Sequence, residues 1–173
     1  MDAYWATYES PLGPLTLLGG DQGLRGLRFP GRGGGLSEAQ HRPDAFAPAL
    51  EQLAEYFAGE RQAFELAFEI GGSQFQRQVW EQLREIPYGT TVSYKELAQR
   101  LGRPGEAREV GAAVGRTPLP ILIPCHRVVA SNGDLTGYLG GLQRKQALLD
   151  LEASVAAGRG PAPAWAFRQL TLS

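Results

Sequence analysis

The chain is organised around residues 118–129, which read PLPILIPCHRVV. This stretch holds Cys125, the only cysteine among 173 residues, and beside it His126, one of two histidines. Three prolines punctuate the apolar lead-in, and proline fixes φ and removes a backbone donor. We therefore expect an extended, stiff arm that presents one sulfur atom at a fixed place.

Two interpretations of Cys125 compete. A lone cysteine after Ile-Leu-Ile is by default a small buried hydrophobe, because free cysteine is among the most buried residue types. His126 favours the other interpretation, since imidazole can take the thiol proton, directly or through a water, and the thiolate is the strong nucleophile. Adjacent residues of an extended segment point opposite ways, so such a transfer needs a bent backbone or a bridging water. The pair indicates a catalytic or metal-binding cysteine, without a named chemistry.

Composition narrows the class of protein. Hydrophobic content of 43% and charged content of 20% are typical of a soluble globular protein, with one large domain or two small ones. One cysteine excludes internal disulfides and multi-cysteine metal sites, and no apolar run is long enough to span a membrane. A free thiol suits a reducing compartment and the chain starts without a signal-peptide pattern, so we expect a cytoplasmic protein without metal or membrane attachment.

Charge is unevenly distributed along the chain, although the net charge is only −1. Residues 1–72 hold 5 Arg against 10 acids, and residues 73–145 hold 10 Lys or Arg against 6 acids. The basic middle third points weakly to an anionic partner. Ordinary solvated helix faces explain the same pattern equally well.

The first 72 residues read as a scaffold domain. Strands are expected at 4–10, 15–18 and 24–29, then a glycine-rich loop at 30–43, a helix at 44–57 and a further strand at 64–70. No residue in this part carries a chemical motif. Gly71-Gly72 is the best domain boundary.

Residues 73–152 read as a second, mainly helical domain. Ser73 and Ser93 each begin a capping box, and the helix after Ser93 is followed, across a Gly/Pro turn, by a second helix. In that second helix Arg108 and Ala112 share the outer face, which suits close approach to a nucleic-acid groove. Paired short helices of this kind are also common in proteins that bind no DNA.

The C-terminal part offers a pocket wall and a possible third catalytic group. Residues 137–142 form a glycine-rich loop, and a last helix is expected at 143–151. Glu152 at its end is either a carboxylate partner of His126 or a solvated helix end, and the residues alone favour the latter. Residues 153–173 read as a loose tail with one docking spot at Trp165-Ala166-Phe167.

Pro124-Cys125-His126-Arg127-Val128 resembles the active-site signature of the O6-alkylguanine-DNA alkyltransferases, also called methylated-DNA–protein-cysteine methyltransferases. The similarity covers roughly residues 73–152. It includes, in the family's order, Phe75-Gln76, Val79-Trp80, Ile86-Pro87-Tyr88-Gly89-Thr90, Ser93-Tyr94, Leu97-Ala98, the arm from Pro120 to Val129, and Gly137-Tyr138 with Gly140-Gly141-Leu142.

The resemblance implies a fold of the α/β (α+β) class. A small ribonuclease-H-like domain would span 1–72, a domain with a helix-turn-helix and an active-site loop would span 73–152, and a tail would follow. It also implies direct-reversal repair, in which one alkyl group moves irreversibly from O6-alkylguanine in double-stranded DNA to the protein. A flipped base, a monomer and no cofactor belong to the same expectation.

The resemblance also implies residue roles. Cys125 would accept the alkyl group, His126 would act as a water-mediated base oriented by Glu152, and Tyr94 would contact the flipped guanine. Arg108 would fill the space left in the duplex. The DNA-binding set is Ser93, Ala107, Arg108, Ala112 and Arg116, and the pocket set is Thr117, Val128, Tyr138 and Leu139.

Two positions depart from the family pattern. Thr117 stands where the family usually has asparagine, so it keeps a hydroxyl but loses the two-sided hydrogen bonding of an amide. Leu139 stands where some members carry serine.

Three alternatives stay open. The protein could be a sensor of alkylated DNA without transfer activity, although it keeps the cysteine. It could be a cysteine hydrolase built on Cys125, His126 and Glu152, or a helix-turn-helix regulator with a structural cysteine.

Overall fold

The structure is a computed structural model that describes residues 3–31 and 34–161. Its first element is a three-stranded antiparallel meander of β1 (Tyr4–Ser10), β2 (Gly13–Gly20) and β3 (Gly23–Arg28), with β2 in the centre. Alternate residues of β2 are buried, as expected for a sheet with one covered face. The three predicted strands are confirmed, and β2 is longer than predicted at both ends.

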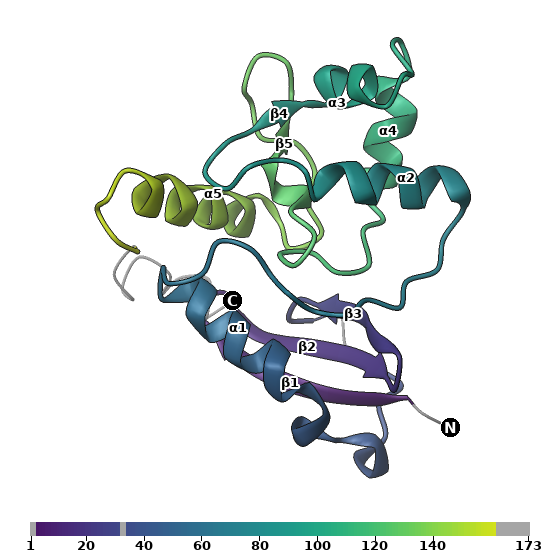
Figure 1. The fold of residues 1–173 in the computed structure, drawn as a ribbon, viewed down its shortest axis with the longest axis vertical. Coiled ribbons are helices and arrows are strands. Elements are labelled where there is room, and N and C mark those ends of the chain that lie inside the picture. The colour runs from purple at the N-terminus through teal and green to yellow at the C-terminus, as the bar shows by residue number, and fades with distance from the viewer. Residues whose placement is uncertain (1–2, 32–33, 162–173) are drawn as a thin grey trace.

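One helix covers this sheet. After the 3-10 turns η1 (Glu38–Gln40) and η2 (Pro43–Phe46), α1 (Ala47–Phe57) packs against β1, as Figure 1 shows. The predicted helix at 44–57 therefore begins as a 3-10 turn. The predicted strand at 64–70 was wrong: this segment makes one isolated bridge, in which Leu24 N donates to Ala67 O and Glu69 N donates to Leu24 O.

Residues 73–129 build the second part of the molecule. Both predicted capping boxes are present, at Ser73 before α2 (Gln74–Leu83) and at Ser93 before α3 (Tyr94–Arg100). The turn after α3 leads to α4 (Ala107–Val114), which packs on both α2 and α3. The indole of Trp80 donates to Ala113 O at 2.9 Å and ties α2 to α4.

The arm before Cys125 is folded, so the prediction of an extended arm was wrong. Ile123 N donates to Leu119 O at 2.8 Å, and Ile121 has a φ of 76° in the left-handed region. Cys125 then opens a 3-10 turn, η3 (Cys125–Arg127). The short strand β5 (Val128–Val129) pairs in parallel with β4 (Val92–Ser93) and so fixes the end of the arm beside the start of α3.

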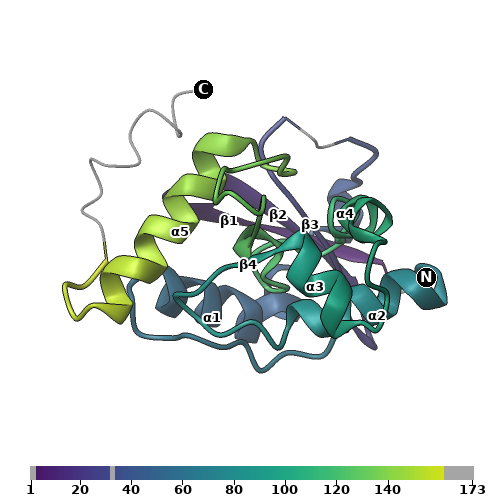
Figure 2. The ribbon, with the colours of Figure 1, turned by 90° about the horizontal axis from the view of Figure 1, so that it is seen from above.

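The last helix, α5 (Leu142–Ala156), is longer than predicted. Glu152 lies inside it and is fully buried, so it is not a solvated helix end. Residues 153–156, which were predicted to begin the tail, therefore belong to α5. The predicted docking spot at 165–167 lies outside the described residues. Seen from above, α5 lies on one side of β4, and α3 and α4 lie on the other (Figure 2).

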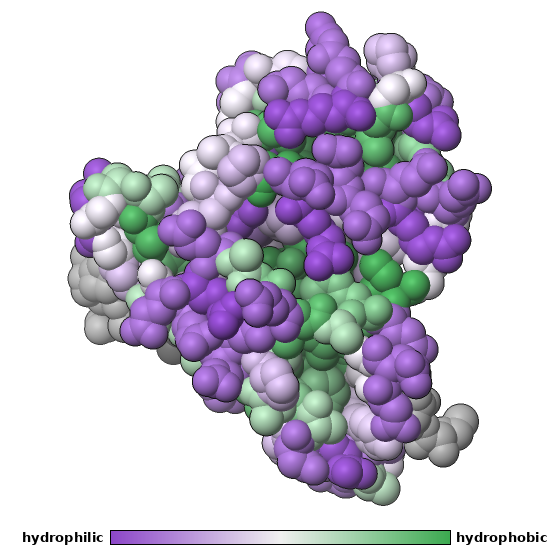
Figure 3. All heavy atoms as spheres, in the orientation of Figure 1, coloured by the Kyte–Doolittle hydropathy of each residue, from purple (hydrophilic) through white to green (hydrophobic). Residues whose placement is uncertain are grey.

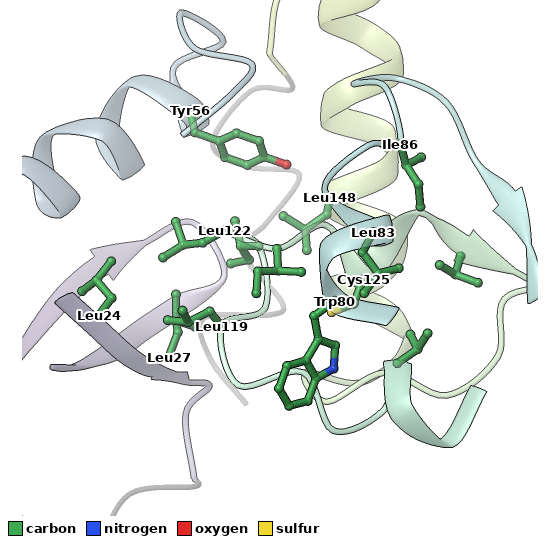
Figure 4. Close-up of a cluster of buried hydrophobic side chains, with 14 of the residues drawn as sticks. Leu24, Leu27, Tyr56, Trp80, Leu83, Ile86, Leu119, Leu122, Cys125 and Leu148 are labelled. Carbon is green, nitrogen blue, oxygen red and sulfur yellow. The ribbon is translucent and has the colours of Figure 1, made fainter. Parts of the chain in front are cut away.

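One hydrophobic core joins the two parts. It runs from Leu24 and Leu27 of the sheet, through Leu119 and Leu122 of the arm, to Cys125 (Figure 4). On the outside, hydrophilic residues cover most of the half that holds α2, α3 and α4 (Figure 3). None of the described helices is long and apolar enough to cross a membrane.

Candidate active site

A pocket of about 280 Å³ opens beside Cys125. Three elements build its wall: the start of α3, one face of α4, and the loop before α5. The lining residues are Tyr94, Gly111, Val114, Gly115, Cys125, Gly137, Tyr138 and Leu139. The chain's one thiol therefore faces a cavity between the paired helices and the glycine-rich loop.

Cys125 is buried, with 3% of its surface exposed, which favours the neutral thiol. Burial raises the pKa of the Cys125 thiol to about 12, while the Thr117 hydroxyl and the Lys145 ammonium act in the opposite direction. A nucleophilic role therefore requires a group that takes the proton as the reaction proceeds.

His126 is held by a buried carboxylate. Its Nε2 lies 2.7 Å from Oε2 of Glu152, and both side chains are fully buried. A carboxylate accepts, so Nε2 carries the hydrogen and a neutral ring keeps its lone pair on Nδ1. Among the described residues Nδ1 has no hydrogen-bond partner. This arrangement leaves His126 with an unshared basic nitrogen.

Glu152 is the centre of the network. It also accepts from Arg127, at 2.8 Å from Nε and 2.9 Å from Nη2, from the Tyr56 hydroxyl at 2.6 Å and from Gly89 N at 3.3 Å. Burial opposes its ionisation, but His126 and Arg127 outweigh burial and hold the pKa of Glu152 well below its usual range. The carboxylate is therefore ionised, and the two-point bond to Arg127 balances its charge.

The charge state of His126 follows from this balance. Burial lowers the pKa of His126, Glu152 raises it, and the Arg127 and Lys145 cations lower it again. The net effect is downward, so the ring is neutral near pH 7. A neutral imidazole with a free Nδ1 can accept a proton, whereas an imidazolium could not.

Tyr94 enters the pocket from the first residue of α3. Its hydroxyl accepts a hydrogen bond of 3.1 Å from Oγ1 of Thr136, and its own hydrogen stays available for a second partner. Its ring packs across α4 at Gly111, where an added Cβ would lie 3.4 Å from Cδ1 of Tyr94. Glycine at this position lets α3 and α4 approach closely.

The structure brings together most of the predicted chemical set. Cys125, His126 and Glu152 lie in or beside η3, and Tyr94, Tyr138 and Leu139 share the pocket with the thiol. Thr117 and Val128 are buried but do not line the pocket: Thr117 donates to Val114 O at 2.7 Å, and Val128 pairs with Val92.

The predicted DNA-binding residues lie on or next to the paired helices. Arg108, Ala112 and Arg116 are exposed, as the outer-face prediction required, and Ala107 is half-buried. Ser93 is buried, and its hydroxyl accepts from Glu96 N as the cap of α3. The cap therefore sets where α3 begins.

Sequence reasoning missed three residues of this site. Arg127 and Lys145 are buried cations, and Tyr56 reaches the network from α1. Arg127 lies inside the motif at 124–128, so its position next to Cys125 and His126 indicated that it could belong to the site. Tyr56 and Lys145 gave no such indication, because each occupies an ordinary position in a helical pattern.

Comparison with known proteins places both parts of the chain. Residues 3–70 match the family model described as 6-O-methylguanine DNA methyltransferase, ribonuclease-like domain. Residues 74–154 match the model described as 6-O-methylguanine DNA methyltransferase, DNA binding domain.

Individual relatives agree with these matches. A methylated-DNA–protein-cysteine methyltransferase of Mycolicibacterium paratuberculosis is 50% identical over 154 residues, which cover 86% of this chain and 91% of the relative. One of Methanosarcina acetivorans is 43% identical over 155 residues, which cover 87% of this chain and 99% of the relative. The crystal structure of Mycobacterium tuberculosis OGT in complex with DNA has a TM-score of 0.84 and 44% identity, covering 95% of this chain and 99% of that one.

Proposed function

The chain belongs to the 6-O-methylguanine DNA methyltransferase family, and on that premise we propose that Cys125 is the residue that accepts the alkyl group. The activity is that of a methylated-DNA–protein-cysteine methyltransferase, a direct-reversal DNA repair activity. The observation that carries the assignment of Cys125 is its position. The chain's one thiol lines the pocket, next to a neutral histidine whose Nδ1 has no hydrogen-bond partner in the part of the chain that the structure describes.

The transfer is a displacement at the alkyl carbon. His126 takes the thiol proton on Nδ1 through a water, and Glu152 and Arg127 hold the ring in the tautomer that makes this possible. The Sγ–carbon bond forms as the carbon–O6 bond breaks, and the electron pair passes to the guanine. The Tyr94 hydroxyl donates to the departing base. A thioether has no easy exit, so each protein molecule acts once.

The substrate is O6-alkylguanine in double-stranded DNA. A base in the stack cannot present O6 to a sulfur atom inside a pocket, so the nucleotide must be flipped out. Exposed Arg108 and Ala112 on α4 suit insertion of this helix into a groove, with Arg108 filling the gap in the stack. Arg116 extends the positive charge of this face, and half-buried Ala107 allows the DNA to approach closely.

The pocket assignment is part of the same proposal. Tyr138 and Leu139 would contact the flipped base, and Thr117 and Val128 would support the wall from the core. We also propose that the protein acts as a monomer. It needs no cofactor, because each chemical step uses a side chain of this chain. It works in the cytoplasm, because its free thiol suits a reducing compartment.

The test uses an oligonucleotide duplex with one O6-methylguanine. We expect intact-protein mass to rise by one methyl group, peptide mapping to place it on Cys125, and the reaction to stop at one equivalent. Cys125→Ala and the same duplex with unmodified guanine are the controls. An unchanged mass with DNA bound would favour a sensor or regulator, and repeated turnover of an ester would favour a hydrolase.

A further inference from the structure

Lys145 is a buried cation without a carboxylate partner among the described residues. Its side chain has 0% exposure, and its ammonium donates to Thr136 O at 2.7 Å. One carbonyl satisfies one of three N–H donors. A buried charge is costly unless an opposite charge or a full set of hydrogen bonds compensates it. The position therefore calls for an anion nearby.

The geometry of α5 shows where that anion lies. Lys145 and Glu152 are seven residues apart, which is about two helical turns, so they share one face of α5. This face packs against η3, where Glu152 binds His126 and Arg127. Lys145 lies two turns nearer the pocket end of the same face, and its ammonium donates to Thr136, whose hydroxyl bonds Tyr94 of the pocket that Cys125 lines. From there the ammonium lowers the pKa of the Cys125 thiol.

The charges around Cys125 leave one pair unmatched. Lys145 of α5 and the Thr117 hydroxyl act on the thiol, and Tyr94 and Tyr138 line the same pocket. Beside them, His126, Arg127 and Glu152 form the buried network. Arg127 and Glu152 neutralise each other, and His126 is neutral. The Lys145 ammonium and the Cys125 thiol, which must ionise to react, are the two groups that have no other opposite charge among the described residues. Burial raises the pKa of Cys125 and lowers the pKa of Lys145, and the charge of each group counteracts this effect on the other.

We propose that Lys145 is a positioning residue of the transfer reaction, whose buried ammonium is the counter-charge of the Cys125 thiolate. The proposal rests on Cys125 being the alkyl acceptor. His126 removes the proton, and Lys145 stabilises the anion that is left until the Sγ–carbon bond forms. A lysine at this place stabilises the thiolate of a deeply buried cysteine, where bulk solvent cannot do so.

A purely structural role for Lys145 predicts the opposite result. The Lys145 ammonium donates to Thr136 O, and the Thr136 hydroxyl donates to the Tyr94 hydroxyl. Loss of the lysine would therefore loosen the pocket wall. A looser wall would expose the sulfur and speed its reaction with a small reagent. Loss of the counter-charge would slow the same reaction.

The experiment measures alkylation of Cys125 by iodoacetamide in the free protein from pH 7 to 10, by intact mass. The chain has one cysteine and two lysines, so Lys145→Met can be matched by Lys95→Met at an exposed position. We expect Lys145→Met to displace the rising limb of the pH–rate profile to higher pH and to react about tenfold more slowly at pH 8, which corresponds to one pKa unit. Lys95→Met should match the wild type. An equal or faster rate in Lys145→Met would overturn the proposal.

A second measurement covers the case in which Lys145→Met does not fold. In protein with ¹⁵N-labelled lysine, the Lys145 ammonium should titrate at lower pH in Cys125→Ser than in wild type, with Lys95 as the internal reference. The same titration in both proteins would overturn the proposal. Neither measurement contains DNA, so failure of alkyl transfer and failure of this proposal are seen separately.

Discussion

The Tyr56 hydroxyl donates a hydrogen bond of 2.6 Å to Oε2 of Glu152, across 96 residues of sequence. Tyr56 lies on α1, the helix that covers the N-terminal sheet, and Glu152 lies on α5. The N-terminal half of the molecule thus supplies one of the hydrogen bonds that the Glu152 carboxylate accepts. Burial and the adjacent Glu152 carboxylate raise the pKa of Tyr56 well above its usual value, so Tyr56 remains a donor.

Tyr56→Phe should lower stability by about 1.5–3 kcal/mol, because the lost hydrogen bond has a charged acceptor inside the core. Urea unfolding of both proteins measures this difference. Tyr88→Phe is the matched control, since the Tyr88 hydroxyl has no partner among the described residues and should change stability by less than about 0.5 kcal/mol. Equal losses in the two variants would contradict the role of the Tyr56 bond.

Arg127 and Glu152 should behave as a coupled pair. Arg127→Met or Glu152→Gln alone leaves one buried charge or its donors unmatched and should cost about 3–5 kcal/mol. The double variant removes both charges, so its loss should be smaller than the sum of the single losses by about 1–3 kcal/mol. Urea unfolding of the four proteins provides the cycle. Additive losses would show that the two side chains act independently.

Acid should destabilise the protein through His126. Burial is the main cause that lowers the pKa of His126 in the folded state, whereas an unfolded histidine titrates near about 6.5. Below about pH 6.5 His126 binds a proton in the unfolded chain but not in the folded protein. The contribution of neutral His126 to the free energy of unfolding is therefore full above about pH 6.5, and it is lost as the pH falls from there toward the lower pKa of the folded state. The slope can reach about 1.4 kcal/mol per pH unit.

The measurement is unfolding free energy between pH 7.5 and 5 for the wild type and His126→Asn. We expect the variant to lack the part of the slope that His126 causes, so that the two curves converge as the pH falls. Parallel curves would mean that His126 keeps the same pKa on folding.

Arg108→Ala should slow transfer from duplex DNA by about tenfold or more, since holding a base pair unstacked is worth a few kcal/mol. Transfer from a single strand should change little, because no stack has to be held open. Arg77→Ala, which removes the same charge from an exposed position on α2, is the control for overall charge. Single-turnover rates on both substrates test this prediction. An equal loss on single and double strands would argue against the finger role.

Thr117→Val should reduce both stability and thiol reactivity. The hydroxyl donates to Val114 O at 2.7 Å, and it also lowers the pKa of the Cys125 thiol. It has one hydrogen, so it can turn from Val114 O to Sγ when the thiolate forms. We expect a loss of about 1 kcal/mol and slower iodoacetamide alkylation. Thr117→Ser keeps the hydroxyl and should keep the reactivity; a slow Thr117→Ser would assign the effect to the missing methyl group.

Local signals predicted much of the fold. The capping boxes at Ser73 and Ser93 depend on residues three apart, and the meander depends on turns and alternating strands, so short stretches of sequence were sufficient. The folded arm was missed because a left-handed Ile121 is rare, and only the core that encloses its side chain makes it possible.

The sequence predicted those residues of the candidate site that lie within the motif at 124–128. Cys125, His126 and Arg127 are consecutive, but their environment is not local: Glu152, Lys145 and Tyr56 come from two distant helices. Residues alone favoured a solvated Glu152, because nothing near it in sequence shows that α5 continues and that this turn is buried. Burial of a charged residue is decided by tertiary packing.

The core that passes from the sheet through the arm to Cys125 is one continuous cluster of buried residues. An added Cβ at Gly140 would lie 2.9 Å from the ring of Phe29, so the pocket loop contacts the residue that directly follows β3. A fragment that began at Ser73 would lose this support, and it would expose Leu119 and Leu122 to water. We therefore expect the N-terminal half and the site around Cys125 to melt in a single transition.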